Sequence, residues 1–243
     1  MKIIHATWEK RNLGCDAWEI TLDHKDMSDV TGVIETLRNP ECSGAYVCVK
    51  LPVGNLHMVH ALEDEGFRFL EVQYSLIEHF SPMDVDIWTE SVGGRVCKEI
   101  TKTESEWRRI VDKIDPEMFE TDRISLDPLL GRDKACRRYQ NWIMDMLKDP
   151  HVRMYVTEID GQEVSFGVER TIGKRTQSIL GGMFSQCKNL GMGLALFANA
   201  KTPSDGRRMR THISSNNIDV LRVHQNCGRI IYKQMYVFRK FYL

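Results

Sequence analysis

The sequence predicts an α/β (α+β) protein in two parts, a small N-terminal α/β unit over residues 1–90 and a larger unit over residues 93–243. Two observations predict this class. Short runs of β-branched and aromatic residues alternate along the chain with stretches whose apolar residues recur at helical spacing. Residues 80–94 contain Ser-Pro and Gly-Gly pairs and resemble a linker between the two parts.

The first part is predicted to contain a strand, a helix and a second strand. Residues 45–51 are rich in strand-forming side chains, and the run ends at Pro52. Apolar residues recur at helical spacing over 56–62, and Gly66 suits the position just past a helix end. Residues 67–77 then form the second strand.

The second part is predicted to alternate strands and helices. A helix over 133–147 carries Tyr139 and Trp142 on one face, and Pro150 ends it. Asp160-Gly161 is a hairpin turn, and residues 119–128 form a loop. The remaining predicted strands cover residues 95–100, 152–159, 163–171, 176–184 and 208–214, with one long strand or hairpin over 228–242, and the remaining helices cover 104–114, 191–201 and 217–226.

One pattern occurs twice. Asn55-x-x-Met58 through Gly66 matches Asn217-x-x-Val220 through Gly228. Each residue of the first copy precedes its match in the second by the same number of positions. We call this constant difference the repeat offset. Each copy follows one predicted strand and precedes another. A chance likeness of two strand–helix–strand units explains this as well as a duplication in which the first copy has lost its chemistry.

Composition excludes several classes of function. Lys plus Arg number 33 and Asp plus Glu 34, so the net charge of −1 disfavours a nucleic-acid binder and a polybasic membrane-surface protein. No apolar run is long enough for a membrane-spanning helix, and the N-terminus does not resemble a signal peptide. The seven cysteines contain no CxxC pair, so we expect no metal site, no disulfide framework and a cytoplasmic location.

The most informative segment is a glycine-bearing turn between a predicted strand and a predicted helix. Glycines at 191 and 193 let the backbone approach a ligand without a Cβ in the way. Backbone N–H groups from Leu190 to Gly193 would be the unpaired donors of a helix's first turn, which suit a phosphate or pyrophosphate. The sequence lacks the GxxxxGK[ST] and GxGxxG patterns of other phosphate-binding loops.

Lys188-x-x-Gly191-x-Gly193 resembles the [QR]-x-x-G-x-[GA] signature of the GNAT acetyltransferase superfamily, with Lys in place of Gln or Arg. The resemblance implies a mixed, mostly antiparallel sheet flanked by helices, and acetyl-CoA as co-substrate. It also implies that acetyl-CoA pairs with the strand leading into the turn, at Gly182 to Ser185, where the Phe184 N–H could bind the thioester carbonyl. The cofactor-binding residues expected on this basis are Phe184, Ser185, Gln186, Lys188, Leu190, Gly191, Met192, Gly193 and Asn217.

A second motif follows in the order that the superfamily predicts. Asn217 through Gly228 resembles the family's N-x-x-A-x-x-L-Y-x-x-x-G-F helix, with His224 at the Tyr position and Arg229 at the Phe position. The resemblance implies that Asn217 contacts the CoA arm and that His224 protonates the departing thiolate. Tyr232 and Tyr236, on the following strand, are the alternative acids.

Residues 119–128 together with Arg138-Tyr139-x-x-Trp142 resemble the dTDP-fucosamine acetyltransferase-like branch of the superfamily. That resemblance implies acetyl transfer to a small-molecule amine acceptor such as a nucleotide-linked amino sugar, by direct attack in a ternary complex. The alternatives are a peptide or protein amine, and a non-catalytic acyl-CoA-binding module. A homodimer is one assembly that the N-terminal unit could build.

The sequence does not identify the general base. The candidates are carboxylates on predicted strands that could reach the cleft, or carboxylates in the predicted acceptor loop, and a water chain could serve in their place. These candidates are Glu158, Glu169, Asp122, Asp127 and Asp133.

Overall fold

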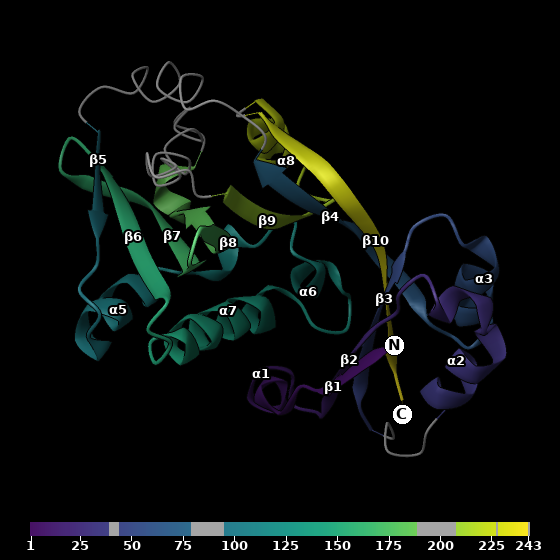
Figure 1. Cartoon of the computed structure of the whole chain (residues 1–243). Helices are drawn as coiled ribbons and strands as arrows, with labels where there is room; N and C mark the ends of the chain where they lie inside the picture. The colour runs from purple at the N-terminus through teal and green to yellow at the C-terminus, as the bar shows by residue number, and fades with distance from the viewer. Residues whose placement is uncertain (39–43, 79–94, 189–207, 227, 243) are drawn as a thin grey trace.

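The computed structural model describes residues 1–38, 44–78, 95–188, 208–226 and 228–242 (Figure 1). The predicted linker and the predicted helix over 191–201 lie outside these residues. The described strands form one ten-stranded sheet with the order β1-β2-β3-β10-β4-β9-β8-β7-β6-β5. Two of the described pairings are parallel, β2–β3 and β8–β9, and the others are antiparallel, which confirms the predicted mixed sheet.

The predicted elements agree closely with those observed. The strands are β1 (Lys2–His5), β2 (Ala17–Thr21), β3 (Tyr46–Pro52), β4 (Arg68–Glu78), β5 (Arg95–Glu99), β6 (Val152–Ile159), β7 (Gln162–Ile172), β8 (Arg175–Met183), β9 (Arg208–Ser214) and β10 (Arg229–Phe241). The helices are α1 (Lys10–Leu13), α2 (Val30–Leu37), α3 (Leu56–Asp64), α5 (Glu104–Val111), α6 (Arg123–Leu126), α7 (Arg132–Met146) and α8 (Ile218–Asn226). The predicted loop over 119–128 is wrong in one respect, because Asp122 caps the short helix α6 through the N–H groups of Ile124 and Ser125.

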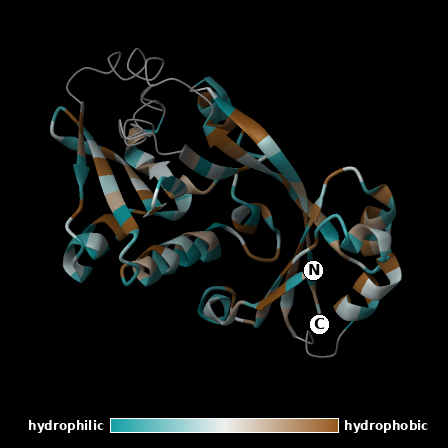
Figure 2. Ribbon diagram, in the orientation of Figure 1, coloured by the Kyte–Doolittle hydropathy of each residue, from teal (hydrophilic) through white to brown (hydrophobic). Residues whose placement is uncertain are grey.

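Two apolar layers hold the sheet between helices, and Figure 2 shows strands banded with hydrophobic and hydrophilic residues. Helices α5 and α7 cover the face of β6 and β7, where Trp107 and Ile143 are fully buried in the largest apolar cluster. Helices α2 and α3 cover the opposite face of β2, β3 and β10, with Val49 and Phe238 in the second cluster. Along β3 the side chains therefore alternate between the two clusters, which is the period of a strand buried on both faces.

The C-terminal strand β10 lies between two strands of the N-terminal unit. It pairs antiparallel with β3 on one side and with β4 on the other. Strand β4 in turn pairs with β9 of the C-terminal unit. The two predicted parts therefore contribute alternating strands to the middle of one sheet, and the predicted boundary near residue 90 lies outside the described residues.

The repeat offset seen in the sequence also relates the elements. Adding it to the bounds of β3 and α3 gives the bounds of β9 and α8. The pairing register repeats as well, since Tyr236↔Leu51 becomes Tyr74↔Ile213. The β4–β10 pairing maps onto itself with Met235↔Gln73 at its centre, and the interruptions in its register, near Leu70 and Tyr232, are also one repeat offset apart. The four central strands thus have a local two-fold axis, which we call the central two-fold.

We expect a fragment of residues 1–78 to remain unfolded as a monomer. Strands β3 and β4 bond to β10 rather than to each other, so the fragment would leave one edge of β3 and both edges of β4 open, and it would lack the buried Val237 and Phe238. Circular dichroism and amide exchange would measure this, and adding a peptide of residues 228–243 should restore strand structure. A cooperative unfolding transition of the monomeric fragment alone would contradict it.

Candidate active site

The sheet is split where β8 and β9 diverge. Their parallel pairing covers three residue pairs, from Arg175↔Arg208 to Gln177↔Arg210. Beyond Gln177, β8 continues alongside β7, with a register interruption that leaves Ile179 opposite no residue of β7. Such a bulge bends and twists the strand that carries it. Beyond the split, one edge of β8 therefore faces the space between the two strands, where a ligand could bind.

The register fixes which backbone groups of β8 face the split. The Phe184 N–H donates to the Val164 carbonyl at 3.0 Å, and hydrogen-bonded pairs alternate along an antiparallel ladder. By that alternation Gly182 also bonds to β7, whereas the N–H groups of Gly181 and Met183 face the split. The expectation that the Phe184 N–H binds the thioester carbonyl is therefore wrong, because that N–H belongs to the ladder.

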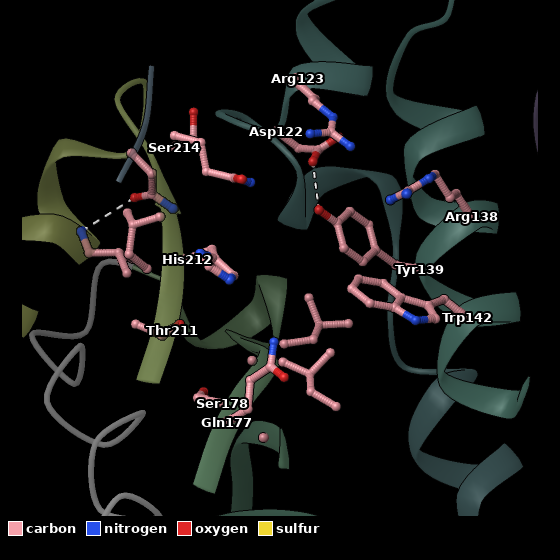
Figure 3. A pocket seen from close by; sticks show the side chains of 18 of the residues that line it. Asp122, Arg123, Arg138, Tyr139, Trp142, Gln177, Ser178, Thr211, His212 and Ser214 are labelled. Atoms are coloured by element: carbon pink, nitrogen blue, oxygen red, sulfur yellow. Dashed lines mark hydrogen bonds between the residues drawn. The ribbon is translucent and has the colours of Figure 1, made fainter. Parts of the chain in front are cut away.

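A cavity of about 800 Å³ passes through the split and reaches both faces of the sheet (Figure 3). On one face it is lined by α8. On the other face helix α7 presents Tyr139 and Trp142 toward strand β9 (Figure 3). Strands β2, β3 and β4 of the N-terminal unit also line it. The cavity thus has room for two reactants that meet at the exposed edge of β8.

The residues expected around the pyrophosphate lie only partly within the described chain. Leu190, Gly191, Met192 and Gly193 lie outside it. Lys188 Nζ forms an ion pair with Glu120 at 3.1 Å, and Ser185 Oγ donates to Asp115. Phe184 is buried in the apolar cluster, and Gln186 is exposed. Among these residues, those described here do not line the cavity.

Asn217 does line the cavity, at the first turn of α8. Its side-chain oxygen accepts a hydrogen bond from the Val220 N–H at 3.3 Å, so the residue caps the helix. The equivalent Asn55 caps α3 in the same way, through the Met58 N–H at 2.9 Å. Capping holds the Asn217 amide at the mouth of the split, where the sequence resemblance implies a contact with CoA.

His224 lines the same side of the cavity and is 5% exposed. Its Nδ1 forms a hydrogen bond with an Nη atom of Arg229. Burial, together with the positive charge of Arg229, lowers the pKa of His224 to about 3. The imidazole is therefore neutral at physiological pH, and because the guanidinium can only donate, the proton of the neutral ring lies on Nε2.

The two tyrosines proposed as alternative acids lie elsewhere. Tyr232 is 47% exposed on β10, with the Arg210 guanidinium over its ring at 5.7 Å. Tyr236 packs against the apolar cluster under α2 and α3. Neither belongs to the described lining of the cavity, whereas His224 does.

The structure separates the candidate bases. Glu169 and Asp122 line the cavity, and Asp122 accepts a hydrogen bond from the Tyr139 hydroxyl at 2.6 Å (Figure 3). Glu158 pairs with Lys98 on the outer strands, at 2.5 Å. Asp127 is buried against the Arg239 guanidinium, with oxygens at 2.6 and 3.0 Å. Asp133 is an exposed residue of α7.

Sequence reasoning missed His212 on β9. Its ring points into the cavity and is accessible from it (Figure 3), and its Nδ1 lies 3.0 Å from Oγ of the buried Ser75. Burial among protein atoms, with the positive charges of Lys50 and Lys233, lowers the pKa of His212. The ring is thus neutral at pH 7, and if Ser75 accepts the Nδ1 proton, Nε2 has a lone pair. The signal available in the sequence was a histidine on the predicted strand that directly precedes the Asn217 motif.

A charged cluster on the same sheet face was also missed. Glu19, Lys50 and Glu71 project from three strands of the N-terminal unit, and Arg123 of α6 lies over them. Glu71 is only 3% exposed. We call these four residues, together with Gln73, the polar floor of the cavity. Lys50 interrupts strand β3, whose other side chains are buried, and this was the signal in the sequence.

The opposite wall is aromatic. The rings of Phe119 and Tyr139 stack at 4.7 Å, and the Arg138 guanidinium lies over the rings of Tyr139 and Trp142 at 5.7 and 5.6 Å. Arg138 is itself held by Glu9 at 2.7 Å. A flat apolar group could therefore lie against α7 while its polar groups face the sheet.

Comparison with known proteins supports the fold. No family model matches the sequence, and no curated protein matches it. A functionally unknown conserved protein from Staphylococcus epidermidis has a similar structure, with a TM-score of 0.65 and 9% identity over 94% of this chain and 85% of that one.

Two proteins described as GCN5-related N-acetyltransferases are also similar. The one from Sphaerobacter thermophilus has a TM-score of 0.59 and 10% identity, over 98% of this chain and 75% of that chain. The one from Kribbella flavida has a TM-score of 0.57 and 13% identity, over 93% of this chain and 81% of that chain. The chain therefore has the fold of this acetyltransferase class. Among the described helices, none is long and apolar enough to cross a membrane.

We expect His224→Gln to flatten the pH dependence of stability. The folded protein holds His224 neutral down to a pKa of about 3, while the unfolded chain takes up a proton near 6.5, so stability falls as the pH drops through this window. Replacing this one ionisable group should reduce the slope of the free energy of unfolding against pH by about 1.4 kcal/mol per pH unit. Urea unfolding between pH 6 and 4 would measure it. The exposed His60→Gln is the control, and an unchanged slope in the His224 variant would contradict the assignment.

Proposed function

We propose that this chain is an acetyl-CoA-dependent N-acetyltransferase that acts on a primary amine. The split between β8 and β9 is the observation that carries the proposal, because the β7–β8 register turns the N–H of Gly181 away from β7 and toward a cavity lined on both faces of the sheet. An extended amide chain such as the pantetheine arm can bond to such an edge. The motif around Gly191 and the fold of the two acetyltransferases above support the same co-substrate.

The reaction requires a neutral amine. The amine nitrogen attacks the thioester carbonyl carbon, a C–N bond forms, the C–S bond breaks, and the sulfur takes up a proton. An ammonium substrate first gives one proton to a base, and the nitrogen loses a second proton as the amide forms. Positioning the two reactants together supplies much of the rate acceleration without a covalent enzyme intermediate.

His212 is the base that the geometry supports best. It reaches the cavity from β9, opposite the α8 side where the CoA arm is proposed to lie, and Ser75 fixes its ring. A pKa below its ordinary value keeps the ring unprotonated at pH 7, which a base requires. Glu169 and Asp122 remain the carboxylate alternatives.

His224 lies on the other side of the split, near the expected position of the sulfur. A ring with a pKa of about 3 carries no second proton at pH 7. Its role in our proposal is therefore to donate a hydrogen bond from Nε2 to the leaving thiolate. Arg229 fixes that tautomer through its bond to Nδ1.

The N-terminal unit is proposed to be a degenerate copy of the C-terminal unit. The matching bounds of β3–α3 and β9–α8, the matching caps at Asn55 and Asn217, and the repeated register support a duplication. In this proposal the first copy no longer binds a cofactor and builds the acceptor side of the cavity.

The function is tested by incubating the protein with acetyl-CoA and a panel of amines and measuring thiol release. The panel contains a nucleotide-linked amino sugar, which the branch resemblance predicts, a peptide amine and small amines. Acetylation of at least one amine is the expected result. CoA binding without turnover on any amine would favour the non-catalytic acyl-CoA-binding module.

We expect His212→Asn to lower kcat by about 10²- to 10⁴-fold, the usual contribution of a positioned base. In the wild type, kcat should fall on the acid side, at a pH below 6.5, because burial and the charges of Lys50 and Lys233 disfavour protonation of the ring. That limb should disappear in the variant, while CoA affinity stays the same. His57→Asn, which changes an exposed histidine on α3, is the control. Full activity of the His212 variant would indicate that a carboxylate is the base instead.

A further inference from the structure

The polar floor contains the Lys50 ammonium, which forms no ion pair with a carboxylate of the described residues. Lys50 Nζ donates to Gln73 Oε1 at 3.3 Å, and no carboxylate oxygen of the described residues lies within 4.0 Å of it. An ammonium has three donors, and burial lowers the pKa of Lys50. Because Gln73 accepts from Lys50 through its oxygen, its own amide NH₂ remains as a second donor beside the ammonium.

The four charges of the floor, Lys50 included, compensate one another. The Arg123 guanidinium lies 3.6 Å from Glu71 and 4.0 Å from Glu19. Two carboxylates, one guanidinium and one ammonium give a cluster with no net charge. A ligand that brings one negative and one positive charge leaves this balance unchanged, whereas a dianion or a simple cation would leave an uncompensated charge in a largely buried site.

Lys50 and His212 face the same space. They are equivalent positions under the repeat offset, and the central two-fold places them on one face of the sheet, on either side of β10 and β4. The Lys50 charge is also close enough to lower the pKa of His212. A small molecule could therefore contact both side chains at once.

We propose that the acceptor is a zwitterion, a primary amine that also bears one carboxylate, as an amino acid does. The carboxylate binds the Lys50 ammonium and the Gln73 amide, and the amine lies beside His212, where it loses its proton and attacks the thioester carbon. The aromatic wall of Tyr139 and Trp142 holds the side chain. This rests on the proposed function and names its substrate class.

The experiment compares two amines that differ only in the carboxylate, phenylalanine and 2-phenylethylamine, with acetyl-CoA in excess. The wild type should acetylate phenylalanine with a kcat/KM about 10- to 100-fold higher, since a hydrogen bond to a charged group contributes this much. In Lys50→Met that advantage should disappear, mainly through the KM for phenylalanine. Because the Lys50 charge also acts on His212, the two amines are compared at pH 8, where the ring is unprotonated in both proteins.

Lys233→Met is the matched control. Lys233 also lowers the pKa of His212, but it is exposed on β10 and does not belong to the described lining of the cavity. Any change in rate in this variant should be the same for both amines, because it acts through His212 alone, and the preference for phenylalanine should remain. This separates carboxylate binding from an effect on the base. Gln73→Leu removes the second donor to the carboxylate and should reduce the same preference for phenylalanine. Calorimetry of phenylalanine binding to the wild type measures the contact without any substitution.

The outcomes separate the two proposals. Acetylation of amines without preference for the carboxylate, or a preference for O-phosphoethanolamine or the nucleotide-linked amino sugar, would overturn the zwitterion and leave the acetyltransferase standing. Equal losses in Lys50→Met for both amines would also overturn it. No acetylation of any amine would overturn the proposed function, and with it the substrate class.

Discussion

The arrangement of the molecule depends on the hydrogen bonds that β10 makes to β3 on one side and to β4 on the other. These bonds join the beginning and the end of the chain into one sheet. They also set the N-terminal unit at a fixed register relative to β9, because β4 continues the ladder. A shift of one residue would turn every inward side chain of these strands to the opposite face. The positions of Lys50, Glu71 and His212 in one cavity follow from that register.

The same ladder explains why the cavity is polar on its sheet side. Side chains on one face of a strand recur every two residues, so Glu71, Gln73 and Ser75 of β4 share a face, and pairing extends it to His212 and Ser214 of β9. The other face of these strands contributes Leu76 and Ile213 to an apolar cluster under α8. Buried charges stabilise a fold less than apolar packing of the same volume does. Stability alone therefore does not account for a polar row in the middle of this sheet.

The sequence predicted the strands with clear boundaries and missed those without them. Strands β6 and β9 were predicted to the residue, because turn-forming residues flank both of them. Strands β1 and β2 were not predicted, since Lys2–His5 and Ala17–Thr21 are short and mixed in character. The alternation of strands from the two parts could not be predicted, because pairing between distant segments leaves no local pattern. The internal repeat was visible in the sequence, but its meaning required the register of the sheet.

The candidate site was predicted where a motif is local and missed where strands assemble it. Asn217 caps α8 and His224 lies on it, so one local motif brings both to the cavity, and their roles there stay predictions. The Phe184 N–H was assigned wrongly, since only the ladder decides which amide faces the split. His212, Ser75 and Lys50 belong to three strands that lie far apart in the sequence, so no spacing rule connects them.

The central two-fold also bears on how such a cavity recognises an asymmetric molecule. A symmetric arrangement would place identical side chains at positions 50 and 212, and would bind two identical groups. Here one position is an ammonium-bearing Lys and the other a neutral imidazole bonded to Ser75, where β10 has the apolar Val237 at the position equivalent to Ser75. The two halves of the scaffold thus present a cation and a base across one space. A molecule with two chemically different ends has one favoured orientation in it, and orientation is what brings an amine to a thioester.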